Sequence, residues 1–209
     1  SAEGYACTVQ LTVTQLSHTG NSVSLTATFT KLSDSERTAQ GITPVRINEV
    51  SANDGIYVDE YFKRQDWVEL YNTTDQPIDV ACMYLSDNPE KPQKYQISLG
   101  DSQSSMSNHN SQFSILNSQL TTIPAHGHLI IWCDKQSPLS QLHASFKLDA
   151  DGDELLLTAT DGSWTDRFVY PNHEKDQTVG RYPDGAQQVY VMNVPTIEKS
   201  NIISSYVID

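Results

Sequence analysis

Short runs in which apolar and polar residues alternate recur along most of this chain. The clearest pair lies within residues 45–72, VRINEVSANDGIYVDEYFKRQDWVELYN, where both ends alternate and the middle is polar. Alternation with a period of two residues predicts strands that bury one face and leave the other in water. We therefore expect residues 45–50 and 66–72 to form two strands, joined by a polar loop over residues 51–65.

Further strand-sized runs follow at short intervals after this pair. Turn-forming clusters of Asp, Asn, Gly and Pro separate them, and no long amphipathic helical pattern competes. Eight short strands of this kind predict an all-β sandwich. Residues 100–118 carry no strand pattern, so we expect a long surface loop there, a kind of segment that often binds partners. The six further runs are residues 78–87, 94–99, 128–133, 154–160, 167–171 and 188–194.

Residues 1–43 differ from the rest in their pattern. Two alternating runs, at residues 9–13 and 22–29, flank a turn-forming His-Thr-Gly-Asn sequence and predict a β-hairpin. Two strands alone are marginally stable in water, so the hairpin either packs on the following domain or is the remnant of a preceding one. The polar residues 33–43 are typical of a linker. We therefore divide the chain into a hairpin segment, residues 1–43, and a sandwich domain, residues 44–209.

Composition narrows the kinds of partner. The chain has 209 residues, enough to bury a substantial core, and a formal net charge of -13 with a pI near 4.7. Its 13 basic residues are dispersed among 26 acidic ones, which argues against a nucleic-acid partner because phosphates need a basic surface. The low charged content of 19 %, with many small polar residues, favours an extracellular β-domain. No run of 18 apolar residues is present, so we expect no transmembrane segment.

The three cysteines permit one disulfide and lack the spacing of a zinc site or a redox motif. They are Cys7, Cys82 and Cys133. Cys82 and Cys133 each lie in an apolar run, and two interpretations are open. They are either two buried small apolar side chains, which we favour, or the two halves of a disulfide.

A set of motifs runs through the proposed domain in a definite order. The motifs are RINEV at 46–50, DWVELYN at 66–72, residues 77–80 and 84–87, IPAHGHLIIW at 123–132, FKL at 146–148, DELLLTATDG at 153–162, residues 166–170 and GRYPDG at 180–185. In this order the set resembles the lamin tail domain family, over residues 44 to about 201. The resemblance implies an immunoglobulin-like β-sandwich, found in the tails of nuclear lamins and in many bacterial secreted or surface proteins.

Three features depart from the pattern of that family. The closing Thr-Pro-Gly turn is missing near residues 195–201, residues 100–118 are longer than the usual connection, and residues 1–43 have no counterpart. The end of the last strand is therefore less well defined by the resemblance than its beginning.

The motif residues have expected structural roles. Trp67 is expected to supply the largest buried area in the sandwich core. The carboxylates of Glu49, Asp66 and Glu69 could act in catalysis. On alternating strand positions, however, we expect them to accept hydrogen bonds from the backbone or from Arg181. The GRYPDG motif predicts a chain reversal, and Arg181 is expected to bridge strands through a charged pair.

The common catalytic signatures are absent from the sequence. It has no nucleophile elbow, no His-Glu-x-x-His motif and no glycine-rich phosphate or dinucleotide loop. His126 and His128 are two residues apart, and such a pair can chelate zinc from one face of an extended segment. They flank Gly127 at the entry to a strand, and we favour a solvated turn. We therefore predict a chain that is not an enzyme and has no catalytic residue, cofactor or metal ligand.

Three aspartates, Asp149, Asp151 and Asp153, alternate like the start of a calcium loop. An EF-hand requires a glutamate at position twelve, and here that position is Thr160, so the EF-hand interpretation fails. Two interpretations are left open, a looser calcium site and, as we favour, a plain acidic turn.

These features together predict a non-catalytic interaction or anchoring module of a bacterial secreted or cell-surface protein. Its partner would be a protein or a cell-surface ligand, bound above all by residues 100–118, and a lipid beyond the N-terminus of this sequence could attach it to a membrane. The alternative is an accessory domain of an exported nuclease or other hydrolase whose catalytic part is not in this chain. A third hypothesis is hydrolysis by His126, His128 and nearby carboxylates.

Overall fold

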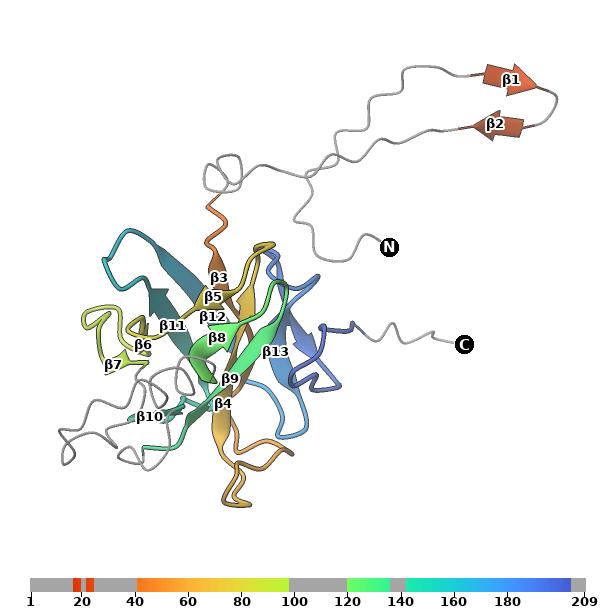
Figure 1. The fold of residues 1–209 in the computed structure, drawn as a ribbon. Coiled ribbons are helices and arrows are strands. Elements are labelled where there is room, and N and C mark those ends of the chain that lie inside the picture. Colours follow the sequence, from red (N-terminus) through yellow and green to blue (C-terminus); the bar gives the residue numbers. More distant parts are fainter. Residues whose placement is uncertain (1–16, 20–21, 25–40, 98–119, 136–141, 204–209) are drawn as a thin grey trace.

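A computed structural model describes residues 17–19, 22–24, 41–97, 120–135 and 142–203, and the named elements of these residues are β-strands (Figure 1). The longer strands are β3 (Val45–Ser51), β4 (Asp66–Asn72), β9 (His128–Cys133), β11 (Gly152–Thr158), β12 (Thr165–Pro171), β13 (Thr178–Arg181) and β14 (Val189–Met192). The shorter ones are β1 (Ser17–Thr19), β2 (Ser22–Ser24), β5 (Ile78–Asp79), β6 (Tyr84–Ser86), β7 (Tyr95–Gln96), β8 (Thr122–Ile123) and β10 (His143–Ala144).

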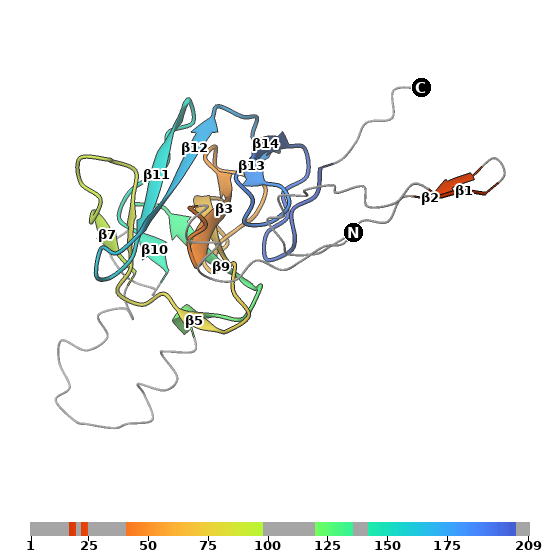
Figure 2. The ribbon, with the colours of Figure 1, turned by 90° about the horizontal axis from the view of Figure 1, so that it is seen from above.

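Two sheets make up the sandwich. One has six strands in the order β10-β9-β4-β3-β13-β14, and the other has four in the order β12-β11-β6-β7. In Figure 2 the strands β11 and β12 run beside β3 and β13 as a second layer. The pair β5 and β8 forms a small separate sheet. This arrangement confirms the predicted all-β, immunoglobulin-like sandwich.

The core lies between the two sheets and is built by alternate residues of their strands. β12 shows the rule most plainly, because Asp166, Phe168 and Tyr170 are buried while the residues between them are exposed. Fully buried side chains from the facing strands complete the core, among them Ile47, Val50, Val68, Leu70, Leu155 and Leu157. Apolar burial of this extent is the main favourable term in folding.

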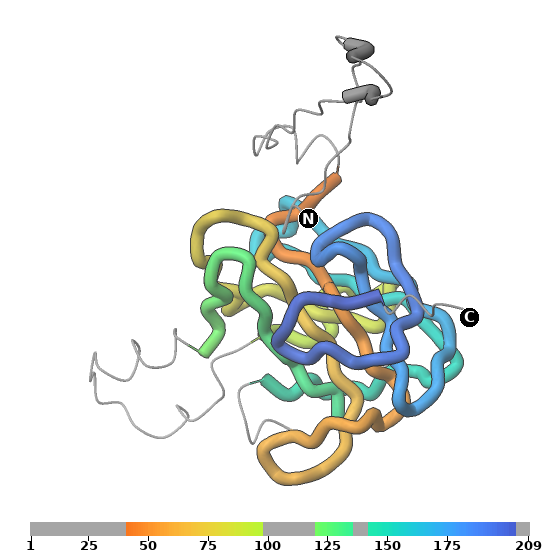
Figure 3. Tube along the Cα trace, turned by 90° about the vertical axis from the view of Figure 1, so that its right-hand side faces the viewer, coloured from red at the N-terminus to blue at the C-terminus, as the bar shows by residue number. Residues whose placement is uncertain are grey.

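The prediction that the two opening strands have one solvated face is wrong. Every residue of β3 and β4 is buried, including the charged residues. Both strands lie in the centre of the six-stranded sheet, and the chain after β14 crosses the face that points away from the core (Figure 3). The polar residues of β3 and β4 are therefore buried under another segment of the chain and do not face water.

Several predicted boundaries also change. The run 78–87 contains two strands, β5 and β6, in different sheets, and Cys82 between them has a positive φ of 68°. The strands β8 and β10 were not predicted, because two residues are too few to show a period. GRYPDG contributes Gly180 and Arg181 to β13, and the chain then turns back into β14. The predicted chain reversal is therefore confirmed, but it begins only at the third residue of this motif.

Part of the N-terminal prediction can be compared with the structure. β1 and β2 pair antiparallel, with His18 opposite Val23, which confirms a hairpin, although His18 and Thr19 belong to β1 and not to the turn. The run 9–13, most of the linker 33–43 and the predicted loop 100–118 lie outside the described residues. The division at residue 43 stays a prediction.

Candidate functional site

Trp67 is buried, as predicted, but on the opposite face of the sheet from the expected one. Its side chain is fully covered and stands outside the cluster between the sheets. Its indole meets the Tyr57 ring edge-on at 6.4 Å between ring centroids, and the Tyr57 hydroxyl donates to the Pro195 carbonyl. Tyr57 therefore links Trp67, on the outer face of the six-stranded sheet, to the C-terminal segment.

The carboxylate of Glu49 accepts hydrogen bonds from the C-terminal segment. It is fully buried and accepts hydrogen bonds from the Thr178 hydroxyl at 2.6 Å and from both the backbone N–H and the hydroxyl of Thr196, at 3.0 and 2.7 Å. Burial raises the pKa of Glu49 above its usual value although these donors lower it. The predicted role as an acceptor of backbone hydrogen bonds is confirmed, and Arg181 is not among these donors.

Glu69 and Asp66 play similar parts on β4. The backbone N–H of Glu198 donates to Glu69 at 2.6 Å, and the N–H groups of Asp54 and Leu148 donate to Asp66. Burial, and then the charge of the nearby Glu49, raise the pKa of Glu69 to about 9. Asp66 also has a raised pKa because of its burial. Hydrogen bonds from other chain segments thus occupy all three of these candidate catalytic carboxylates.

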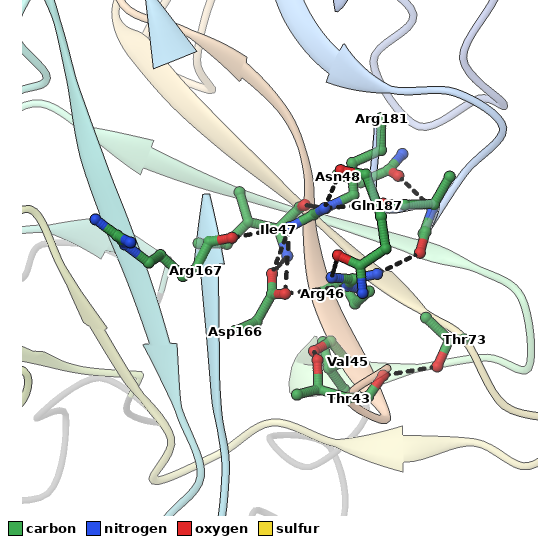
Figure 4. Close-up of polar contacts among 12 residues, drawn as sticks. Thr43, Val45, Arg46, Ile47, Asn48, Thr73, Asp166, Arg167, Arg181 and Gln187 are labelled. Atoms are coloured by element: carbon green, nitrogen blue, oxygen red, sulfur yellow. Dashed lines mark hydrogen bonds and ion pairs between the residues drawn. The ribbon is translucent and has the colours of Figure 1, made fainter. Parts of the chain in front are cut away.

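The partner of Arg181 is Asp166, and this pair joins the two sheets (Figure 4). Arg181 Nη2 lies 3.2 Å from both carboxylate oxygens, and Arg46 Nε donates to Oδ1 at 3.0 Å. The Ile47 N–H donates to Oδ2 at 2.8 Å. Burial lowers the pKa of Arg181 to about 10 although the Asp166 charge raises it. The predicted charged pair between strands is confirmed, and both arginines contact the same buried carboxylate.

His126 and His128 point to different carboxylates. His126 Nε2 lies 2.9 Å from Asp75 Oδ1 in a half-exposed position, whereas His128, with a side chain 9 % exposed, has its Nε2 3.5 Å from Asp184 Oδ2. Both imidazoles flank the Tyr71 ring, at 6.3 and 5.0 Å between centroids. The solvated turn that we favoured describes His126 and not His128, which is largely covered.

The acidic run before β11 forms a turn. Asp149 Oδ1 accepts a hydrogen bond from the Asp151 N–H, the Gly152 N–H donates to the Asp149 carbonyl, and Asp153 Oδ1 accepts from the N–H of Glu154. These contacts are those of an aspartate-stabilised turn. Whether the three aspartates bind calcium stays a prediction without a test.

The described cysteines are not bridged. Cys82 and Cys133 both have free thiols, so the disulfide interpretation is wrong. Cys133 is fully buried, as we favoured, but Cys82 is exposed in the bend between β5 and β6. Cys7 lies outside the described residues.

The loop between β3 and β4 presents apolar side chains to solvent. Ile56, Val58, Tyr61 and Phe62 are 46, 47, 47 and 87 % exposed, and Phe62 is the most exposed large apolar residue among those that the structure describes. Asp59 organises the tip, since its Oδ1 accepts hydrogen bonds from the N–H groups of Tyr61 and Lys63 at 2.9 and 2.8 Å. Phe62 adopts a φ of 61° there. The exposed side chains thus stand on a tip whose backbone conformation is fixed by hydrogen bonds.

The same aspartate belongs to a cluster of possible metal ligands. One donor atom from each of Asp59, Asp134 and His143 lies within 4.8 Å of the others, and it is the only such group of three within the described residues. His143 Nδ1 lies 2.8 Å from Asp134 Oδ2, and Nε2 lies 3.1 and 3.2 Å from the Glu60 oxygens. Burial lowers the pKa of His143, but these carboxylates outweigh it and the pKa is raised above its usual value.

Strand pairing explains how these residues meet. Asp134 directly follows β9. The last residue of β9, Cys133, pairs with Asp66 at the end of the β3–β4 loop. β10 pairs parallel to β9 and places His143 beside Trp132. This cluster was not predicted from the sequence, because Asp59 is far from the other two residues in sequence and no regular spacing links them. The polar character of residues 51–65 was the one available signal.

Comparison with known families supports the assignment made from motifs. The sequence model of the Lamin Tail Domain matches residues 38–172, more than half of the chain. No curated protein and no solved structure gives a match. The matched segment includes the central strands β3 and β4 and both strands of the β11–β12 pair. Its motifs and its immunoglobulin-like sandwich agree with this match, and the chain belongs to the lamin tail domain family.

Proposed function

We propose that this chain is a non-catalytic interaction or anchoring module of a bacterial secreted or cell-surface protein, and that the loop of residues 52–65 is its contact surface. The observation that carries the proposal is Phe62, a large apolar side chain that is 87 % exposed at a tip held by Asp59. Exposed apolar groups in one place on a protein commonly mark a site where another molecule binds. A fixed loop also loses less conformational entropy on binding than a flexible one.

The chemistry of the loop indicates the kind of partner. Ile56, Val58, Tyr61 and Phe62 offer aromatic and branched apolar contacts, which are enriched in the centres of protein interfaces. The net charge of -13 would repel an acidic polymer. A protein with an apolar pocket is therefore the partner that fits best. Export is supported by the composition alone, and within the described residues no helix has the length and apolar character needed to cross a membrane.

Substitution of Phe62 tests the proposal. Phe62→Ser should reduce the binding of the labelled protein to envelope fractions of the source cells by about tenfold or more, because aromatic anchors dominate interface energies. Val169→Thr is the matched control, since Val169 is also apolar and 55 % exposed but lies on β12. Both variants should keep the wild-type melting temperature. Equal binding by Phe62→Ser and wild type would exclude the loop as the contact surface.

A further inference from the structure

We propose that Asp59, Asp134 and His143 form a binding site for one divalent transition-metal cation, best suited to Zn²⁺, with Glu60 at its solvent side. The three side chains come from three parts of the fold: the β3–β4 loop, the residue after β9, and β10. The proposal does not depend on the partner surface proposed above. It would hold even if the apolar loop bound nothing.

The donor atoms of the three side chains converge in a buried place. Asp59, Asp134 and His143 are 4, 7 and 4 % exposed, and one donor atom from each lies within 4.8 Å of the others. Zinc sites in proteins hold nitrogen and oxygen donors about 2 Å from the ion, so only a small contraction is needed to surround a cation. Surface carboxylates that meet by chance are seldom buried in this way.

One oxygen of the cluster has no hydrogen-bond partner within the described residues. Asp59 Oδ1 accepts two backbone hydrogen bonds, but Oδ2 is buried and has no hydrogen-bond partner within the described residues. Buried polar atoms in folded proteins are nearly always satisfied, and an exception calls for an explanation such as a bound ion. The hydrogen bonds that the Asp59 carboxylate accepts from the backbone of the loop tip use only Oδ1. Oδ2 is therefore the oxygen that the fold leaves available for a cation.

The charge of the site also favours a cation. Asp59, Asp134 and Glu60 bring three carboxylates to one imidazole, and Tyr61 adds a ring whose centroid lies 6.0 Å from that of His143. Two buried carboxylates close to one another repel unless a positive charge lies between them. A divalent cation supplies that charge.

The donor types select the class of cation. An imidazole nitrogen with carboxylate oxygens suits Zn²⁺ and similar transition metals, whereas Ca²⁺ prefers six to eight oxygen ligands. His143 has a carboxylate at each ring nitrogen, Asp134 at Nδ1 and Glu60 at Nε2. If one ring nitrogen binds the ion, the other can still donate to a carboxylate, which is how metal-bound histidines are usually oriented. Glu60 is 47 % exposed on its side chain and can close the site from solvent.

Binding of a cation would connect the loop to the sheet. Asp59 holds the loop tip through its backbone hydrogen bonds, while Asp134 and His143 belong to the edge formed by β9 and β10. A shared ion would join these parts directly. The loop that carries the exposed apolar residues would then be attached to the sheet through Asp59 at its tip.

Titration of the full chain with Zn²⁺ by isothermal calorimetry tests this site. Wild type should bind one equivalent, and Asp59→Asn should weaken that binding by about tenfold or more. Asn keeps the oxygen that accepts from Tyr61 and Lys63, so the loop should still fold. His143→Ala should have the same effect on zinc. His126→Ala is the matched control, because His126 also lies beside an aspartate, Asp75, and its variant should bind zinc like wild type.

Cobalt gives a second measurement that does not rely on heats of binding. Co²⁺ added to wild type and to His126→Ala should produce the visible absorption of a four-coordinate ion, and Asp59→Asn should not. Circular dichroism establishes that each variant is folded. If His143→Ala does not fold, Asp59→Asn decides the question. The proposal is overturned if wild type binds no zinc, if Asp59→Asn binds it as tightly as wild type, or if His126→Ala abolishes binding.

Discussion

Among single residues, Glu49 and Glu69 are carboxylates in a place that solvent does not reach. The C-terminal segment donates backbone N–H groups to both, from Thr196 and Glu198. Their raised pKa values follow from burial and mean that the folded state holds protons more tightly than the unfolded chain does. The stability of the fold is therefore linked to pH through these two groups.

The pH dependence of stability is the first prediction. The pKa of Glu69 rises from a usual 4.5 to about 9, so its stabilising contribution is full below pH 4.5 and is lost as pH rises towards 9. Glu69→Gln removes this titration. Between pH 5 and 8 the variant should lose less stability than wild type, by on the order of 1–3 kcal/mol. Urea unfolding at pH 5, 6.5 and 8 measures the difference.

An exposed glutamate serves as the control for that measurement. Glu90 is exposed, so Glu90→Gln should follow the wild-type dependence on pH. If the curve of Glu69→Gln also ran parallel to wild type, Glu69 would not carry the linkage.

Between elements, Asp166 joins the two sheets through several hydrogen bonds. It lies on β12 and receives Arg46 and the Ile47 N–H from β3 as well as Arg181 from β13. Arg181 also donates to the Ile47 carbonyl and lies over the Phe168 ring at 5.2 Å from its centroid. One carboxylate thus balances two buried guanidinium groups across the sandwich.

Removal of that charge is the second prediction. Asp166→Asn leaves two buried arginines without a counter-charge, and loss of one partner from a buried ion pair costs about 3–5 kcal/mol. Chemical denaturation should show this loss. Glu154→Gln is the matched control, because it breaks an exposed pair with Arg167 on neighbouring strands and should leave the unfolding midpoint close to wild type. Similar midpoints for both variants would contradict the role of Asp166.

The sequence predicted elements where apolar residues dominate and failed where polar residues are buried. The runs that became β4, β9 and β11 were found because their packing against the core leaves a clear pattern. The burial of the outer face of β3 and β4 was not predicted. A glutamate that is covered by a hydrogen-bonding chain segment and a glutamate in water give the same pattern in the sequence. The same holds for the amide of Asn48, which is fully buried and accepts a hydrogen bond from the Gly185 N–H.

The candidate metal cluster was beyond sequence analysis for a different reason. Its ligands meet only through the pairing of β9 with β4 and the parallel addition of the two-residue strand β10. Strands this short show no detectable period in the sequence, and the residues of a strand do not indicate which strand will pair with it in parallel. The register of the sheet had to be known before Asp134 and His143 could be placed beside Asp59.

Across the whole molecule, the chain beyond the segment matched by the family completes the sandwich. The match ends at residue 172, but β13 pairs with β3 through Val179 and Val50, and its Arg181 pairs with Asp166. Asn201 then donates to the carbonyls of Asn48 and Arg181 at 3.2 and 2.8 Å. Figure 3 shows this last segment crossing the sheet near β3. Residues 173–201 are thus part of the folding unit.

Truncation tests this conclusion and is the third prediction. A chain of residues 1–172 lacks β13 and β14, so β3 loses a neighbour, Asp166 loses Arg181, and Glu49 and Glu69 lose the donors that cover them. It should show no cooperative thermal transition in near-ultraviolet circular dichroism. A chain of residues 1–203 keeps all of these contacts and should melt like the full protein. Cooperative melting of the 1–172 chain near the full-length midpoint would mean that the matched segment folds without its C-terminal cover.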